Sequence, residues 1–292
     1  MLRAVNDMVF KFIFGEESRK ELLRELVNLV LERVGLPLAA TVTIRNPFSL
    51  RKFASDKEAV LDIEASDDSG RLFDLEMQIK RQETYGARAL YYWSRVNAAQ
   101  LSIGSGYEAL HPVIGIHILD FVMREDKPRF MKVCRMADID DPDAEDRFIL
   151  TDKATLITLE IPLMDRGPDC GRLEKLLQLL EREGGDHAMI EALTEQDKFF
   201  AEVDEAYQKF HANPELMSEY EARQKWLHDQ ATYIEEARQK WLHDQATYIE
   251  EARADGLKEG KAEDARNFKK LGVDISIIEK ATGLSAKEIE GL

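Results

Sequence analysis

The chain has little cysteine, no long apolar run and a shortage of positive charge. Its 292 residues include two cysteines, Cys134 and Cys170. Two are too few for a disulfide framework, which predicts a reducing compartment such as the cytoplasm. The longest apolar run, residues 112–123, is interrupted by His117 and Asp120, so no membrane-crossing segment is expected. The first residues, MLRAVNDMVFKF, lack the apolar stretch of a signal peptide.

The charge balance narrows the possible partners. The chain carries 40 Lys and Arg against 56 Asp and Glu, a formal net charge of −16 at pH 7. This balance argues against a protein that binds DNA through an extended basic surface. Nucleic-acid binding would therefore need a local basic patch or a divalent cation. The sequence also has no Gly-rich phosphate loop, no zinc-type cysteine cluster and no Ser-His-Asp spacing, which removes several common enzyme classes.

Helix and strand patterns alternate over residues 1–165. A short helix is predicted between a cap at Asn6 or Asp7 and a stop at Gly15. Further helices are predicted at residues 17–34 and 81–102, and strands at residues 41–45, 61–67, 71–80, 112–121 and 148–161. This order predicts an α/β domain, a mixed sheet flanked by helices, over residues 1–165.

Strand patterns disappear beyond residue 165, which predicts an all-helical region at residues 166–292. Residues 221–250 are the fifteen-residue unit EARQKWLHDQATYIE written twice without a change, which indicates a recent in-frame duplication. It would lengthen one amphipathic helix by about 22 Å. A period of 3.75 residues per turn favours a right-handed supercoil. The aromatic side chains would pack on a partner helix, so a coiled coil and a homo-oligomer are expected; they are Trp226, Tyr233, Trp241 and Tyr248.

The last residues, 271–292, predict two short helices around Gly283. Ser285 and Glu288 have the spacing of a capping box for the second of them. A packing or dimerisation element and a DNA-reading helix-turn-helix both fit this pattern.

The segment LDIEASDDSGRLFDLEMQIK, residues 61–80, holds six carboxylates between Asp62 and Glu76. Its alternation predicts a hairpin with a three-residue loop at residues 68–70 and a left-handed Gly70. That register places Asp62 opposite Glu76, and Glu64 opposite Asp74. Opposed like charges destabilise a strand pair. Either water and strand twist offset the repulsion, or Asp62 and Glu76 share a hard divalent cation such as Mg²⁺.

Asp62 and the triplet Glu76-Met77-Gln78 stand within an ordered series of segments. The other members are Asp7-Met8-Val9-Phe10-Lys11 with Phe14-Gly15, Asn46-Pro47, Arg88 with Tyr91-Tyr92, Gln100, Gly106-Tyr107, Pro112-Val113-Ile114 and Leu284-Ser285. In this order the chain resembles the PD-(D/E)XK nuclease superfamily and, more narrowly, the Rpn family of recombination-promoting nucleases and transposases.

The resemblance implies a restriction-endonuclease-like core and a DNA endonuclease that depends on Mg²⁺ (or Mn²⁺) and acts in recombination or mobile-element biology. It implies Asp62 and Glu76 as metal ligands, with the Met77 carbonyl as a further ligand. Gln78 would position water at a place where the wider superfamily usually has lysine. Because glutamine adds no positive charge, we expect Lys80, on the same strand face, to supply it.

The helix predicted after the hairpin contains candidate substrate-binding residues. Arg81, Tyr85, Arg88, Tyr92 and Arg95 recur at helical spacing and form one stripe. Arg81, Arg88, Tyr92 and Arg95 are candidates for DNA binding, holding phosphates and stacking on bases. In the other interpretation the tyrosines pack on the sheet and the arginines pair with the carboxylates of the hairpin.

Three further residues have simpler explanations than a role in catalysis. Asp7 is a candidate extra ligand but also a helix cap, Gln100 is a polar helix position, and His117 is expected to be an interior histidine. Two other functions stay open. One is a catalytically degenerate nuclease fold that acts as an interaction protein through its helical tail, and the other is a defence- or toxin-type nuclease.

Overall fold

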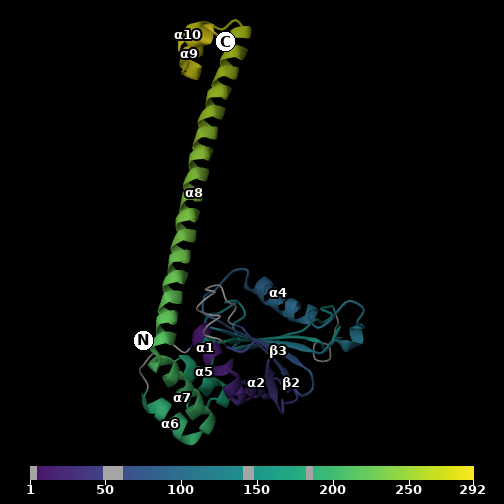
Figure 1. Cartoon of the computed structure of the whole chain (residues 1–292). Coiled ribbons are helices and arrows are strands. Elements are labelled where there is room, and N and C mark those ends of the chain that lie inside the picture. Colours follow the sequence, from purple (N-terminus) through teal and green to yellow (C-terminus); the bar gives the residue numbers. More distant parts are fainter. Residues whose placement is uncertain (1–4, 49–61, 141–147, 182–186) are drawn as a thin grey trace. The chain divides into compact units, whose positions relative to one another are not determined.

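A computed structural model describes residues 5–48, 62–140, 148–181 and 187–292 of the chain (Figure 1). By their contacts they group into two compact units, Met1–Arg223 and Gln224–Leu292. Helix α8 (Pro214–Lys270) begins in the first unit and continues into the second. The division predicted at residue 165 stays a prediction.

A mixed sheet of six strands forms the centre of the first unit. The strands lie in the order β1-β2-β3-β4-β6-β5. β3 and β4 are parallel, as are β4 and β6, and the other neighbours are antiparallel. The strands are β1 (Val42–Ile44), β2 (Ile63–Asp67), β3 (Leu72–Gln78), β4 (Val113–Leu119), β5 (Met131–Cys134) and β6 (Ala154–Glu160).

Helices cover both faces of this sheet. α4 (Tyr85–Ala98) lies over one face, and α1 (Asp7–Phe14), α2 (Lys20–Arg33), α5 (Arg172–Glu181) and α7 (Lys198–Ala212) lie on the other side (Figure 1). α6 (His187–Gln196) packs against α7, and the single-turn helices η1 (Glu17–Arg19), η2 (Tyr107–Ala109) and η3 (Ile161–Leu163) connect larger elements. The predicted fold class, a mixed sheet flanked by helices and followed by a helical extension, is confirmed.

Side-chain alternation along β3 separates two cores. Phe73, Leu75 and Met77 join the large core made with α1, α2, α5 and α7. Leu72, Asp74 and Glu76 point to the opposite face, under α4, because successive side chains of a strand alternate. Leu72 packs there with Trp93 in a smaller apolar cluster. The large core therefore stabilises the sheet, and the α4 face is left to hold polar side chains.

The β2–β3 hairpin has the predicted register. Ile63 pairs with Leu75 and Glu64 with Asp74, and Gly70 has a φ of +84°. The Asp67 carboxylate accepts hydrogen bonds from the backbone N–H groups of Ser69 and Arg71. Residue 61 lies outside the described residues, and Asp62 directly precedes β2.

The predicted and the observed elements differ in two places. The helix predicted at residues 81–102 is shorter, because α4 begins at Tyr85 and ends at Ala98. Ahead of it, residues 79–84 are exposed, so they bury no apolar face that would stabilise a further helical turn. The second difference is β5, which the sequence patterns missed. β5 is a half-exposed edge strand of four residues, too short to show alternation.

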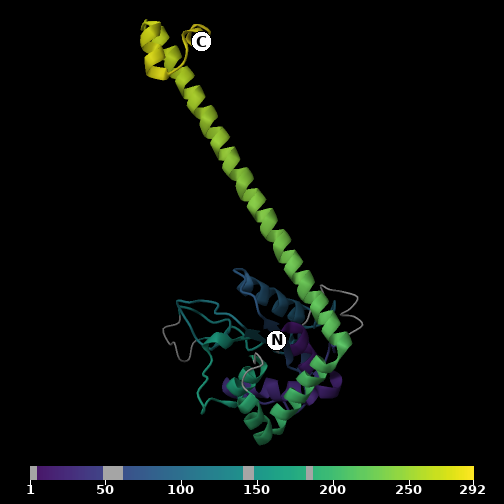
Figure 2. The same ribbon diagram turned by 90° about the vertical axis from the view of Figure 1, so that its left-hand side faces the viewer.

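The second unit consists of most of α8, α9 (Ile275–Thr282) and α10 (Ala286–Glu290). α8 is one uninterrupted helix of 57 residues that contains both copies of the duplicated segment (Figure 2). The predicted helix pair at the end of the chain is present, with Gly283 at a φ of +70° and a capping box between Ser285 and Glu288. Among the described residues, no helix combines the length and apolarity that a membrane crossing needs.

Candidate active site

Four carboxylates gather on the α4 face at β2 and β3. We call Asp62, Glu64, Asp74 and Glu76 the carboxylate cluster. Asp62, Asp74 and Glu76 are only 6%, 1% and 8% exposed, and Glu64 is half-buried. Side chains that are ionised at neutral pH are rarely this buried without compensation. The solvated hairpin that the sequence left open is therefore not what the structure contains.

Burial and mutual repulsion shift the titration of the cluster. The pKa of Asp74 is raised to about 7, first by burial and then by the charges of Asp62, Glu76 and Glu64. Burial also raises the pKa of Asp62 and of Glu76, against the lowering effects of Lys11 and Arg88 respectively. Asp74 Oδ1 has no hydrogen-bond partner within the described part of the chain. The cluster thus holds more negative charge than its neighbours compensate.

Two arginines of α4 lie over the carboxylate cluster. Arg88 donates from Nη2 and Nε to Glu76 Oε1, at 2.7 and 3.2 Å. Arg95 Nη2 lies 3.4 Å from Asp62 Oδ2 and 3.6 Å from Glu64 Oε1. Both guanidinium groups contact the ring of Tyr92, with centroid distances of 5.2 and 5.1 Å. In this structure the arginines pair with the hairpin carboxylates, one of the two arrangements that the sequence allowed.

Arg81 is not part of this arrangement. It precedes α4, is exposed, and its Nη1 lies 3.1 Å from Glu125 Oε1. The continuous helical stripe predicted from Arg81 to Arg95 is therefore wrong at its first member, because the helix begins four residues later. Tyr85 is also different from its neighbours on the stripe, since its ring is buried against Phe121.

Sequence reasoning missed the role of Lys11. This lysine is 7% exposed on α1, and its Nζ donates to the backbone carbonyl of Asp62 at 2.7 Å. Its charge lowers the pKa of Asp62. Asn46 contacts the same carbonyl through Nδ2 at 3.2 Å and accepts from the Glu64 N–H at 2.7 Å. A lysine within the otherwise apolar sequence MVFKFIF was the signal, because a buried cation usually needs a partner.

Tyr85 and His117 lie beneath Glu76. The Tyr85 hydroxyl is 2.6 Å from His117 Nδ1, which is 3.7 Å from Glu76 Oε2. Burial, and then the charge of Arg88, lowers the pKa of His117 to about 4, so the ring is neutral at physiological pH. His117 is fully buried, as expected of an interior histidine, but it faces the cluster.

The remaining predicted positions lie at or beyond the end of β3. Gln78 is half-buried and donates from Nε2 to the Lys80 carbonyl at 3.2 Å. Lys80 is exposed and follows the strand. The Met77 side chain is in the large core, so only its backbone is available to the α4 face.

Asp7 and Gln100 are engaged in structural contacts. Asn6 caps α1 by accepting from Met8 and Val9. Asp7 also accepts from the Met8 N–H, at 2.8 Å, and pairs with Arg223 at 2.9 Å. Its charge contributes to the raised pKa of Glu76. Gln100 bonds to both backbone groups of His111, away from the cluster.

The donor set fits a hard divalent cation. Within the described ranges, no group of three or more Asp, Glu, His or Cys side chains already converges as a metal site. Mg²⁺, however, commonly uses one or two protein carboxylates and completes its shell with water and phosphate oxygens. Asp62 and Glu76 satisfy that need, and Asp74 beside them has an oxygen with no hydrogen-bond partner among the described residues.

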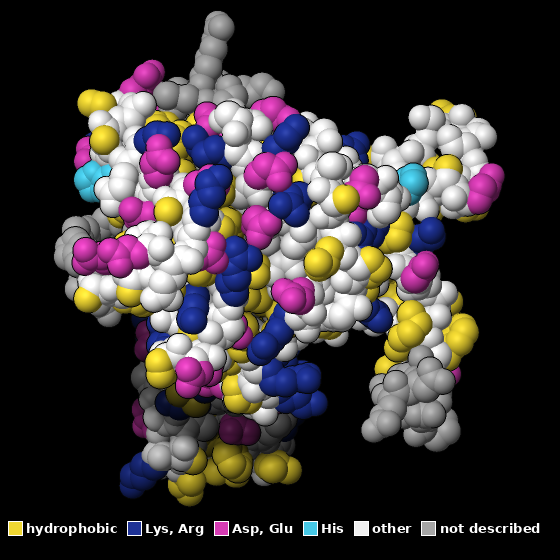
Figure 3. All heavy atoms as spheres, turned by 90° about the horizontal axis from the view of Figure 1, so that it is seen from below, with side chains coloured by type: hydrophobic (Ala, Val, Ile, Leu, Met, Phe, Trp, Pro, Cys, Tyr) yellow, Lys and Arg dark blue, Asp and Glu magenta, His cyan; other side chains and the backbone are white. Residues whose placement is uncertain are grey.

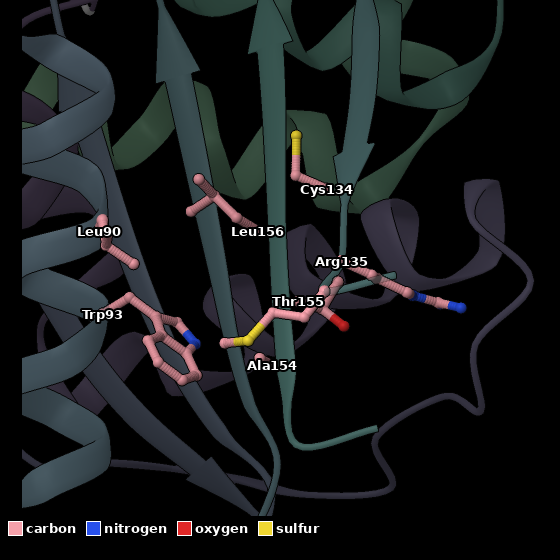
Figure 4. A pocket seen from close by; sticks show the side chains of 8 residues that line it. Leu90, Trp93, Cys134, Arg135, Ala154, Thr155 and Leu156 are labelled. Carbon is pink, nitrogen blue, oxygen red and sulfur yellow. The ribbon is translucent and has the colours of Figure 1, made fainter. Parts of the chain in front are cut away.

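Elsewhere on the surface there is a groove whose lining residues include no Asp or Glu. Its volume is about 180 Å³, and it lies beside α4 and β6 (Figure 4). Leu90 and Trp93 line it from α4, and Leu156 from β6, together with Cys134, Arg135, Met136, Ala154 and Thr155. This lining is mainly apolar. On the face shown in Figure 3, acidic and basic side chains are interspersed, unlike the basic surface of an electrostatic DNA binder.

A mixed sheet with helices on both faces and carboxylates gathered at two adjacent strands fits a PD-(D/E)XK nuclease fold. Residues 4–237 match the profile of the PD-(D/E)XK nuclease family transposases. The chain belongs to this family. No curated protein and no solved structure was found to match it.

Proposed function

We propose that the protein is a Mg²⁺- or Mn²⁺-dependent DNA endonuclease of Rpn type that hydrolyses phosphodiester bonds in recombination or mobile-element biology. The observation that carries the proposal is the buried carboxylate cluster on β2 and β3, with Asp74 Oδ1 unpartnered among the described residues. Family membership supports the class of reaction. Because the chain has a net charge of −16, it repels phosphate, and a cation at the site would offset this repulsion.

In this proposal Asp62, Glu76 and the Met77 carbonyl hold the cation. A bound divalent cation supplies Lewis acidity and charge neutralisation at a scissile phosphate. Gln78 orients the attacking water through its amide, and Lys80 adds the positive charge that glutamine lacks. Lys11 is a positioning residue, since its contact is with the Asp62 backbone carbonyl. In this structure Arg88 makes two hydrogen bonds to the Glu76 carboxylate.

DNA contacts are proposed for Arg81, Arg88, Tyr92 and Arg95. Their support is position, because Arg88, Tyr92 and Arg95 share the side of α4 that covers the carboxylate cluster. Arginine binds phosphate oxygens with two donors, and an aromatic ring stacks on bases. Arg81 is exposed just ahead of α4, where it can reach the backbone of the same substrate.

We also propose that the protein self-associates through α8. Tyr233, Trp241 and Tyr248 are exposed on this helix, as are Ile234 and Ile249. Large apolar side chains repeated along a solvent-facing helix are typical of a coiled-coil surface. Analytical ultracentrifugation should show a dimer or higher oligomer, and a monomer at micromolar concentration would contradict this part.

With two cysteines and no membrane segment predicted, the proposed location is the cytoplasm.

One observation favours a second candidate function. Asp62 and Glu76 both pair with arginines, and Gln78 stands where lysine is usual. A catalytically degenerate nuclease fold that acts as an interaction protein would have these features. A defence- or toxin-type nuclease would share the chemistry of the main proposal and differ in its biological target.

Plasmid nicking separates the enzyme from the interaction protein. The full chain is incubated with supercoiled DNA and Mg²⁺, with EDTA in place of Mg²⁺, and with the Asp62→Ala variant. We expect nicking in the first case only, since the EDTA reaction lacks the metal ion and the variant lacks a metal ligand. The Asp140→Asn variant, changed at an exposed acid outside the site, is the matched control and should nick normally.

A further inference from the structure

The carboxylate cluster is neutralised mainly by side chains that can move. Within the described part of the chain, its four acids face three cations, Lys11, Arg88 and Arg95. Lys11 is buried and donates to the backbone carbonyl of Asp62. The side chains of Arg88 and Arg95 are 35% and 42% exposed. They reach the acids from α4 rather than from the sheet that carries the acids.

The two arginines contact the acids that are proposed to bind metal. Arg88 makes both of its bonds to one oxygen of Glu76. Arg95 lies near one oxygen of Asp62 at a long 3.4 Å and shares its charge with Glu64. A cation held by Asp62 and Glu76 would meet these guanidinium groups directly. Like charges this close repel strongly where burial lowers the dielectric constant.

The combined charge of the Arg88 and Arg95 guanidinium groups equals that of one divalent cation. Replacing the two arginines by such a cation therefore leaves the total charge of the cluster unchanged. Tyr92 contacts both guanidinium groups through its ring, so the two arginines share a neighbour beside the cluster that does not depend on the acids. An aromatic face stabilises a cation at a modest free energy.

We propose that Arg88 and Arg95 are displaceable counter-ions of the metal ligands. They hold Glu76 and Asp62 when no divalent cation is present and leave those oxygens when one binds. Once released, they present two positive charges beside the site to a phosphodiester. This inference rests on the cation site of the proposed function. It adds that the arginines and the cation compete, so each weakens the binding of the other.

Calorimetric titration of the DNA-free full chain with Mn²⁺ tests the competition without measuring activity. We expect Arg95→Gln and Arg88→Gln each to bind Mn²⁺ roughly five- to tenfold more tightly than the wild type, as for a moderate coupling between two sites. The double variant should bind more tightly than either. Arg124→Gln is the matched control, because Arg124 pairs with the exposed Asp126, and its affinity should equal that of the wild type.

The outcomes distinguish this inference from the proposed function. If the wild type binds Mn²⁺ and Asp62→Ala does not, the cation site stands. Unchanged or weaker binding by both arginine variants then overturns the competition alone. If the wild type does not bind Mn²⁺, the proposed function and this inference both fail. Circular dichroism of each variant confirms that it is folded.

A spectroscopic readout follows the arginines themselves. The Arg88 Nε–H donates to Glu76, so its side-chain NMR signal should shift on addition of Mg²⁺ to the wild-type protein. The Arg124 signal should not. An Arg88 signal that stays unchanged while Mg²⁺ binds contradicts the exchange.

Discussion

The two units of the molecule are stabilised in different ways. In the unit Met1–Arg223, a large core of buried side chains fixes the sheet and its helices. In the unit Gln224–Leu292, most of α8 is exposed, and the apolar cluster centred on Ala265, Ile278 and Ile289 is small. Local rules such as caps and helix-forming residues account for the second unit. Tertiary packing accounts for the first.

This difference explains why the candidate active site lies in the first unit. Buried carboxylates with shifted pKa values exist only where a core excludes water, as it does around Asp74. The many acids of the second unit stay solvated, and the unit has no comparable site within the described residues. Its exposed aromatic residues instead suit a surface for association. Variants at the candidate site should therefore change activity or stability strongly, and changes in α8 should not affect the first unit.

The Lys80→Ala variant should lose most cleavage activity without losing stability. If Lys80 supplies the positive charge that Gln78 lacks, its removal should lower Mg²⁺-dependent cleavage by about a hundredfold, within the range seen when one stabilising group is removed. Because Lys80 is exposed, the melting temperature should not change. Initial rates of plasmid nicking measure the effect, and unchanged activity rules out the role given to Lys80.

The Asp74→Asn variant should show how much the buried negative charge of Asp74 destabilises the folded protein. With its pKa raised from 3.8 to about 7, folded Asp74 binds a proton that the unfolded chain releases between these pH values. Folding stability therefore falls as pH rises from about 4 to about 7. In EDTA at pH 8, the variant should gain free energy of unfolding of the order of 3 kcal/mol over the wild type. The gain should vanish below pH 4.

Urea unfolding at pH 4, 6 and 8 measures this dependence. Asp140→Asn serves as the control, since that acid is exposed and should show no such trend. A gain for Asp74→Asn that is the same at all three pH values contradicts the assignment of the charge to Asp74.

Deleting residues 236–250, one copy of the duplicated segment, should have the smallest effect. These residues are exposed along α8, so the melting temperature of the unit Met1–Arg223 should change by no more than about 1 °C, as for surface changes away from any special feature. Differential scanning calorimetry checks this. A drop of several degrees would show that the repeat supports the core, against the separation of the two units.

Much of the site follows from local sequence patterns. The alternation in residues 61–80 and the need for a left-handed Gly70 predicted the register that brings Glu64 opposite Asp74. These are short-range rules that one segment contains in full. The resemblance to nucleases then singled out Asp62 and Glu76, which are untested as ligands but lie together on the α4 face.

The rest depends on contacts between distant segments. Lys11 is 51 residues from Asp62, and no spacing rule predicts that a lysine on α1 meets that carbonyl. The start of α4 was misplaced because helical spacing continues back to Arg81, while the packing that favours a helix begins at Tyr85. β5 was missed because a four-residue edge strand depends on its neighbour β6 for its conformation.

Mg²⁺-dependent plasmid nicking by the full chain, compared with Asp62→Ala at equal concentration and equal folded fraction, tests the central claim most directly. We expect the wild type to convert supercoiled DNA to the open circle, and EDTA or the substitution to lower the rate by more than about a hundredfold. Equal nicking by the wild type and Asp62→Ala, or none by either, would contradict it.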